Sequence, residues 1–338
     1  MLPERDLRVR PHKEPWALNR LLAAMKHDLV QCLRCPDCAT TFSLVIAEED
    51  AGQVKTGTLT CASGHTFPIQ RFVPRFVDSE KYADTFSRQR LYVRRHFKYY
   101  RSDRSGYALF ERTTGLTDRL LAAGVTLEIG CGYGRFLDVV NSKGGRVVGV
   151  DLSTHSVDLA QDFVGLRPGV DIVQADLFKL PFSRNWFDQV YSIGVLHHTP
   201  DTSRAFEAIT PFARPGGRVS IWVYPPEDKY STNRMRRVTA RMDHRLLYAL
   251  CIVNQVAFSW IRALPGGWRF NRLIDGTVPA KGRPFWIRVL SDFDNLSPTY
   301  AHVHTPQEVV DWFAGMGFRD IRVLDRRTAV TGSRGDTA

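Results

Sequence analysis

The glycine-rich segment LEIGCGYGRF, residues 127–136, constrains the fold of this chain more than any other feature. It places Gly130, Gly132 and Gly134 between a strand-like apolar run and a helix-like amphipathic run. Glycines at such a junction permit a tight turn, and they allow the backbone to approach a bound nucleoside or amino-acid moiety closely. The segment therefore predicts a strand, a ligand-binding turn and a helix in direct succession.

Strand-like and helix-like runs alternate from residue 125 onward, with one interruption after residue 224. Such alternation is typical of a parallel sheet that carries helices on both faces. The sequence therefore predicts an α/β fold of the Rossmann-like, doubly wound kind, with a seven-stranded and mostly parallel sheet. The expected strands lie at 126–129, 147–151, 172–175, 188–193, 219–224, 319–324 and 328–331.

Acidic residues at the ends of the first three expected strands separate two classes of cofactor. Glu128 lies at the end of the first strand, Asp151 ends the second, and Asp176 follows the third. The glycine spacing is G-x-G-x-G, whereas the dinucleotide fingerprint is G-x-G-x-x-G. A dinucleotide presents a pyrophosphate to the helix N-terminus, but S-adenosylmethionine instead carries an ammonium and an adenine amine that need carboxylate or carbonyl acceptors. The acidic set therefore favours S-adenosylmethionine.

Five ordered motifs between about residues 124 and 225 resemble those of class I S-adenosylmethionine-dependent methyltransferases. They read LEIGCGYGRF, VGVDLS, QADLFKLPF, FDQVYSIGVLHH and ARPGGR. The resemblance implies that Glu128 and Gly130 approach the methionine end of the cofactor, that Asp151 takes the ribose hydroxyls, and that Asp176 with Leu177 lies at the adenine. The whole implied cofactor site comprises Glu128, Gly130, Gly132, Gly134, Asp151, Leu152, Asp176, Leu177 and Ile193.

Two histidines follow the fourth expected strand, at the sheet edge where ligands bind in open α/β folds. Methyl transfer from a sulfonium is an in-line displacement, so a protein mainly aligns the nucleophile and a general base is optional. His197 and His198 are therefore candidate catalytic residues, and a purely structural or cofactor-facing role is the alternative. Tyr224, Tyr300 and His302 are candidate substrate contacts, with ordinary packing as their alternative.

Four residues near the N-terminus have the spacing of a zinc site. Cys35 and Cys38 form a two-residue knuckle, and Cys61 and His65 follow after 22 intervening residues. Zinc prefers four such ligands in a tetrahedron, which leaves no open position for catalysis. The pattern predicts a structural Zn²⁺ in a small unit, with nearby Cys32 as a possible substitute ligand and a metal-free thiol cluster as the alternative. The unit is similar to the Trm112-like zinc ribbons that precede methyltransferase domains.

Composition shifts divide the rest of the chain. The predicted organisation is a tail at 1–28, the zinc ribbon at 29–78, a helical connector at 79–123, the methyltransferase domain at 124–225 and 291–333, and a helical lid at 226–290.

No secretory signal is recognised at the N-terminus, so a cytoplasmic location is expected. The apolar run 246–261 is interrupted by Asn254 and Gln255, so no stable membrane insertion is expected. Arginines before this run leave an interfacial helix open as an alternative to a solvated basic face.

Two kinds of acceptor fit the sequence. A lid of this size between the fifth and sixth strands suits an enclosed small-molecule acceptor, which is the favoured hypothesis. The alternative is methylation of ribosomal or transfer RNA, because the net charge is +11 and residues 86–104 interleave basic and aromatic side chains. In that case the zinc ribbon and the basic connector would contact the RNA.

Overall fold

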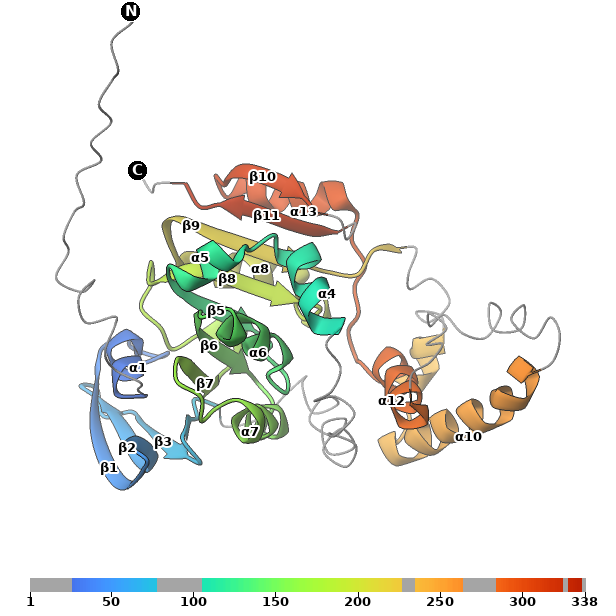
Figure 1. The fold of residues 1–338 in the computed structure, drawn as a ribbon, viewed down its shortest axis with the longest axis horizontal. Coiled ribbons are helices and arrows are strands. Elements are labelled where there is room, and N and C mark those ends of the chain that lie inside the picture. Colours follow the sequence, from blue (N-terminus) through green and yellow to red (C-terminus); the bar gives the residue numbers. More distant parts are fainter. Residues whose placement is uncertain (1–25, 78–104, 227–234, 264–283, 325–327, 336–338) are drawn as a thin grey trace, which may run out of the picture.

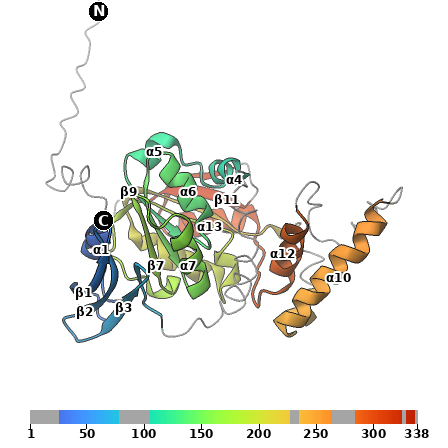
Figure 2. The same cartoon turned by 60° about the horizontal axis from the view of Figure 1, so that its bottom comes forward.

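The computed structural model describes residues 26–77, 105–226, 235–263, 284–324 and 328–335. It contains a small antiparallel sheet, a large mixed sheet flanked by helices, and a pair of helices that extends away from the large sheet (Figure 1). The small sheet and the extended helix lie at opposite ends of the molecule in both views (Figures 1 and 2). The tail before residue 26 and the basic run 86–104 lie outside the described residues.

The N-terminal unit is a helix followed by an antiparallel sheet in sequential order. Phe42, Phe67 and Phe76 pack together in its interior, with ring centroids 4.9 to 5.8 Å apart. Both Ala51 and Gly52 have positive φ angles, which are the geometry of a tight hairpin turn between the two longest strands. The elements are α1 (Lys26–Cys32), β1 (Phe42–Asp50), β2 (Gln53–Cys61), β3 (Thr66–Gln70) and β4 (Val73–Pro74).

The large sheet confirms the predicted seven-stranded, mostly parallel architecture, in the order β10-β11-β9-β8-β5-β6-β7. Strands β5 to β9 are parallel, and β11 runs antiparallel to both of its neighbours. The chain moves outward from β5 to β7 and then returns to β8 on the other side of β5, which creates a switch point for ligand binding. The strands are β5 (Val125–Ile129), β6 (Arg146–Asp151), β7 (Val170–Gln174), β8 (Phe187–Ile193), β9 (Ala213–Trp222), β10 (Arg319–Val323) and β11 (Ala329–Ser333).

Helices cover both faces of this sheet and bury two apolar clusters. One cluster contains Phe110, Leu137 and Val157 from the helices between residues 105 and 163, and the other contains Phe206 and Phe313. A capping box joins Thr305 and Glu308 at the last helix. The α-helices are α4 (Ser105–Thr114), α5 (Asp118–Ala122), α6 (Arg135–Ser142), α7 (Thr154–Phe163), α8 (Thr202–Ile209) and α13 (Pro306–Gly315), and the 3₁₀ turns are η4 (Leu177–Lys179), η5 (Leu196–His198) and η6 (Thr210–Phe212).

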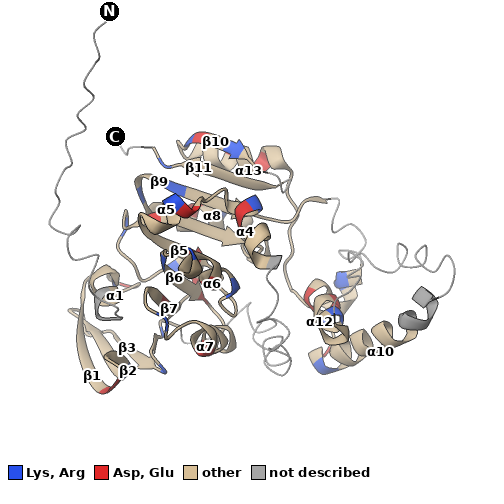
Figure 3. Cartoon of the chain, in the orientation of Figure 1, with Lys and Arg blue, Asp and Glu red and all other residues tan. Residues whose placement is uncertain are grey.

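The helix pair formed by α10 (His244–Ala263) and α12 (Phe285–Leu296) lies between β9 and α13 in the sequence. Leu247 and Cys251 of α10 pack against Val289 and Phe293 of α12. Because α12 continues through residue 290, the lid boundary expected there falls inside a helix. In the described part of α10, charged residues occur only at its beginning (Figure 3). Among the described residues, no helix is long and apolar enough to cross a bilayer.

The N-terminal unit packs directly against the large sheet near β7. Leu33 and Leu59 belong to the same apolar cluster as Phe182 and Val173. Two arginines that follow β3 reach across to α7: Arg71 and Arg75 both contact the Asp158 carboxylate, at 3.4 and 2.7 Å. The two sheets therefore share one continuous apolar core.

Candidate functional site

The glycine turn after β5 adopts a conformation that only glycine tolerates. Gly130 has a φ angle of +77°, and its N–H donates to the Val150 carbonyl oxygen at 2.7 Å. A Cβ on Gly130 would lie 2.4 Å from a methyl carbon of Val195, far inside van der Waals contact. The turn is therefore held closely between β6 and the segment that follows β8.

Asp151, at the end of β6, connects this turn to the start of α7. One carboxylate oxygen accepts a hydrogen bond from the Gly132 N–H, and the other accepts one from the Ser153 N–H, both at 2.9 Å. Ser153 in turn caps α7 by accepting from the Ser156 N–H. Each carboxylate oxygen can accept a further hydrogen bond, so Asp151 is fixed in place and can still receive ligand hydroxyls.

A pocket opens at the carboxyl ends of the parallel strands, beside the glycine turn. Its empty volume is about 840 Å³, a figure that includes the open solvent at its mouth. Strands β5 and β6, the segments that follow β7, β8 and β9, and the helices α7 and α12 contribute to its wall. The lining residues include Gly130, Asp151, Leu152, Ala175, Leu177, Val195, His198, Thr199, Tyr224 and Asp294.

Four of the expected cofactor residues line this pocket, namely Gly130, Asp151, Leu152 and Leu177. The other expected cofactor residues are not among its lining residues: Glu128, Gly132, Gly134, Asp176 and Ile193. Asp176 instead caps η4, where its carboxylate accepts a hydrogen bond from the Phe178 N–H at 3.0 Å.

Glu128 is buried on β5 rather than placed in the pocket wall. The Tyr191 hydroxyl on the neighbouring strand β8 donates to its carboxylate at 2.9 Å. Burial raises the pKa of Glu128 to about 8, the nearby Asp151 charge adds to this, and the Tyr191 hydrogen bond opposes it. The structure thus gives Glu128 a buried partner within the sheet.

The raised pKa of Glu128 predicts a pH-dependent contribution to stability. Between its usual pKa of 4.5 and about 8, the folded protein keeps a proton that the unfolded chain loses. The contribution is therefore fully present below pH 4.5 and is lost as the pH rises through about 8. Replacement Glu128→Gln removes this titration. The melting temperature of the variant minus that of wild type should therefore increase as the pH is raised from 5 to 8.

Thermal unfolding at several pH values in this range measures this difference. The exposed Glu111→Gln variant is the control. If the melting temperatures of Glu128→Gln and wild type changed in parallel with pH, the prediction would be contradicted.

The two candidate catalytic histidines occupy different positions. The Nδ1 atom of His198 lies 2.7 Å from the Tyr300 carbonyl oxygen. Because a carbonyl oxygen only accepts, Nδ1 is the donor in this contact. His198 lines the pocket, whereas the fully buried His197 stacks on Tyr224 at a centroid distance of 3.8 Å.

Of the three expected substrate contacts, only Tyr224 lines the pocket. Tyr300 orients His198 through its carbonyl group, and the His302 N–H donates to the His197 carbonyl oxygen at 2.9 Å. Their backbone thus supports the histidine segment from outside the pocket wall. The sequence analysis did not predict Asp294, which also lines the pocket. The sequence feature that could have indicated it is an acidic side chain in the mostly apolar helix α12.

Two aromatic residues of α12 lie away from the pocket. Phe285 and Trp286 pack in the cluster between α10 and α12 and are not among the pocket residues. Their apolar surface stabilises the helix pair, and the acidic Asp294 is the residue that α12 contributes to the pocket.

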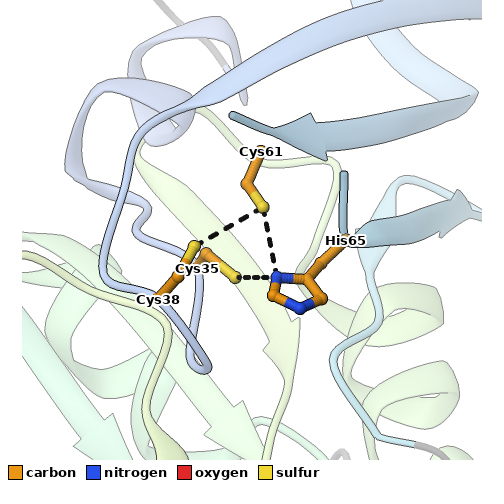
Figure 4. A group of neighbouring side chains, drawn as sticks. All are labelled: Cys35, Cys38, Cys61 and His65. Atoms are coloured by element: carbon orange, nitrogen blue, oxygen red, sulfur yellow. Dashed lines mark hydrogen bonds between the residues drawn. The ribbon is translucent and has the colours of Figure 1, made fainter. Parts of the chain in front are cut away.

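The predicted metal ligands come together in the N-terminal unit (Figure 4). The ligand atoms of Cys35, Cys38, Cys61 and His65 all lie within 4.8 Å of one another. His65 Nδ1 lies 3.5 Å from Cys35 Sγ and 3.3 Å from Cys61 Sγ, and Cys38 Sγ lies 3.6 Å from Cys61 Sγ. In a tetrahedral zinc site with Zn–S bonds of about 2.3 Å, neighbouring sulfurs are about 3.8 Å apart. The donor set and its dimensions therefore fit a zinc ion.

Cys32 is not part of this cluster. Its thiol is buried and donates to the Leu29 carbonyl oxygen within α1 at 3.1 Å. The expectation that Cys32 could substitute as a ligand is therefore wrong, because the helix directs its sulfur into the apolar core.

Comparison with known proteins gives one family match and several partial relatives. Residues 127–221 match the family model described as a methyltransferase domain. A sterol 24-C-methyltransferase of Gibberella zeae is 29% identical over 124 residues, which are 36% of this chain and 33% of the relative. A probable tRNA methyltransferase 9B of Bos taurus is 36% identical over 105 residues, which are 30% of this chain and 22% of the relative. An S-adenosylmethionine-dependent methyltransferase structure from Mesorhizobium loti has a TM-score of 0.30 and 28% identity, over 34% of this chain and 52% of that chain.

The sheet order and the glycine turn agree with the family match on the class of the central domain. Residues 127–221 match a methyltransferase domain. The chain spans a third or less of the length of the two curated relatives described above.

Proposed function

We propose that this protein transfers the methyl group of S-adenosylmethionine to a small-molecule acceptor. The observation that carries the proposal is the composition of the pocket wall, where α12 from outside the family match contributes Asp294 to the pocket that the Gly130 turn also lines. A pocket with contributions from the sheet and from an additional helix suits an acceptor that is enclosed beside the cofactor. The sterol methyltransferase relative also acts on a small molecule, as its name states.

Within this pocket we assign the cofactor to the end formed by β5, β6 and β7. The Gly130 turn would accommodate the methionine portion, Asp151 would accept the ribose hydroxyls, and Leu152 with Leu177 would contact the adenine. When bound, S-adenosylmethionine supplies an electrophilic methyl group on a sulfonium and leaves as a neutral thioether. The protein residues have to hold the acceptor in line and exclude water.

We assign the role of general base to His198. It lines the pocket, and its Nδ1 donates to the Tyr300 carbonyl oxygen, so Nε2 is the nitrogen that would act on the acceptor. It can therefore take a proton from an acceptor hydroxyl or amine as the nucleophile attacks. His197 contributes to the site by packing against Tyr224.

Replacement His198→Asn is expected to lower the rate of methyl transfer about 10² to 10⁴-fold, because general base catalysis contributes on this order. Cofactor affinity, measured by calorimetry, should change much less than the rate, and the rate should lose its pH dependence near neutral pH. His155→Asn on α7, outside the pocket wall, is the matched control. An unchanged rate or pH profile in His198→Asn would refute the assignment.

The acceptor class is tested by transfer of labelled methyl from S-adenosylmethionine with the purified protein. Total RNA and a protein-free metabolite extract, both from a host that lacks the gene, are used side by side. Label in the metabolite fraction supports the proposal and allows the product to be identified by mass. Label in RNA alone would replace it with the second candidate function, RNA methylation, which the net charge of +11 and the tRNA methyltransferase relative favour.

We further propose that residues 29–78 are a structural zinc ribbon held by Cys35, Cys38, Cys61 and His65. The convergence of three thiols and one imidazole supports this assignment. Four protein ligands would complete the coordination of the ion, so its role is to stabilise the small unit.

A further inference from the structure

Helix α10 has an unusual distribution of polar and apolar side chains. Two polar residues that interrupt its apolar run, Asn254 and Gln255, face the neighbouring helix α12. Both donate their side-chain N–H groups to the same carboxylate oxygen of the buried Asp292, at 2.9 Å for Asn254. The polar groups that interrupt the apolar run in the sequence are therefore used inside the helix pair.

The opposite side of α10 is apolar and exposed to solvent. Leu246, Leu250, Val253 and Val256 are 53%, 45%, 61% and 49% exposed, and their spacing places them along one face of the helix. No charged residue occurs between residues 246 and 257 (Figure 3). Single exposed apolar residues are common on proteins, but a continuous exposed stripe of this kind indicates a surface that contacts another apolar phase.

Positive charge precedes this stripe in the chain. Arg237, Arg241 and Arg245 are all exposed, and Arg245 lies in the first turn of α10, one residue before Leu246. Asp243 is the one acidic residue between residues 235 and 257, and its carboxylate accepts hydrogen bonds from the Arg245 and Leu246 N–H groups at 2.9 and 3.1 Å. The chain that leads into the stripe is thus predominantly cationic.

We propose that the outer face of α10 docks on the surface of an anionic phospholipid bilayer. The stripe of Leu246, Leu250, Val253 and Val256 would enter the boundary of the acyl chains, with the helix lying in the plane of the interface, and the three arginines would contact lipid phosphates. A second copy of the chain would also cover the stripe, but it would leave the arginines without anionic partners. The inference is independent of the proposed methyl acceptor.

Cosedimentation of the full-length protein with large unilamellar vesicles tests the proposal. Vesicles of phosphatidylcholine with 30% phosphatidylserine are compared with vesicles of phosphatidylcholine alone. Binding to the anionic vesicles is expected, and a triple variant with Arg237→Gln, Arg241→Gln and Arg245→Gln should weaken it roughly a hundredfold, since each basic residue contributes about a fivefold factor. The double variant Leu250→Glu and Val253→Glu should abolish binding. Both residues are exposed, so the fold should be retained.

The matched control is Leu166→Glu, which alters a residue 62% exposed in the loop after α7 and should leave vesicle binding unchanged. Failure of the wild-type protein to bind anionic vesicles would overturn the proposal, as would equal binding by the Leu250→Glu and Val253→Glu double variant. Light scattering after size-exclusion chromatography gives a further arm. A wild-type dimer that the double variant converts to a monomer would assign the stripe to a second copy instead.

Discussion

Replacement Asp151→Ala is expected to weaken S-adenosylmethionine binding by about a thousandfold. The substitution removes the acceptors of the Gly132 and Ser153 N–H groups, so the glycine turn loses its connection to α7. It also removes the carboxylate proposed for the ribose hydroxyls. Two lost hydrogen bonds to a charged group, at about 2 kcal/mol each, correspond to about three orders of magnitude in affinity.

Isothermal titration calorimetry of the purified variant measures this effect directly. Asp118→Ala is the matched control because Asp118 is a surface carboxylate that pairs with Lys143, the C-cap residue of α6. The control should bind the cofactor with wild-type affinity. A dissociation constant for Asp151→Ala within a few fold of wild type would show that the cofactor is held elsewhere in the pocket.

Much of the large sheet could be predicted from the sequence because its strands are short apolar runs bounded by turn residues. The expected strands 147–151 and 188–193 differ from β6 and β8 by one residue at their starts. The expected strand 219–224 begins six residues later than β9, because a proline and two glycines before it read as a turn. In the structure Ala213 already pairs with Phe187 of β8, and residues 214–217 form an irregularity before Arg218 pairs with Gln189.

The sequence predicted only those pocket residues that lie at or just after the carboxyl ends of parallel strands. Asp151, Leu177 and His198 follow three strands whose carboxyl ends meet at one edge, and all three line the pocket. Asp294 could not be found this way, because the path of α12 back to the sheet depends on tertiary packing. Glu128 was expected near the cofactor on family grounds, but its contact with Tyr191 on the adjacent strand requires knowledge of the strand order.

The orientation of α10 is a further property that the linear pattern does not contain. Asn254 and Gln255 reduce the hydropathy of the helix wherever they point. Only the position of the buried Asp292 on α12 shows that they face inward. The exposed face is consequently more apolar than the average of the helix indicates.

Removal of zinc is expected to destabilise the whole molecule rather than the ribbon alone. Leu33 and Leu59 of the N-terminal unit share an apolar cluster with Val173 and Phe182 of the large sheet, so disorder in the ribbon would expose part of that core. Structural zinc commonly contributes many kcal/mol to folding, and a loss of about 7 kcal/mol lowers the melting temperature of a chain of this size by roughly 10 °C.

The prediction is checked by metal analysis and thermal unfolding of Cys61→Ser beside Cys251→Ala. Cys61 belongs to the cluster, whereas Cys251 is a buried cysteine between α10 and α12. We expect Cys61→Ser to lose bound zinc and to unfold at least about 10 °C below wild type, whereas Cys251→Ala should retain one zinc per chain. Chelation of the wild-type protein, with loss of metal verified, should reproduce the behaviour of Cys61→Ser. An unchanged melting temperature after verified zinc removal would contradict the structural role, because the shared core couples the ribbon to the sheet.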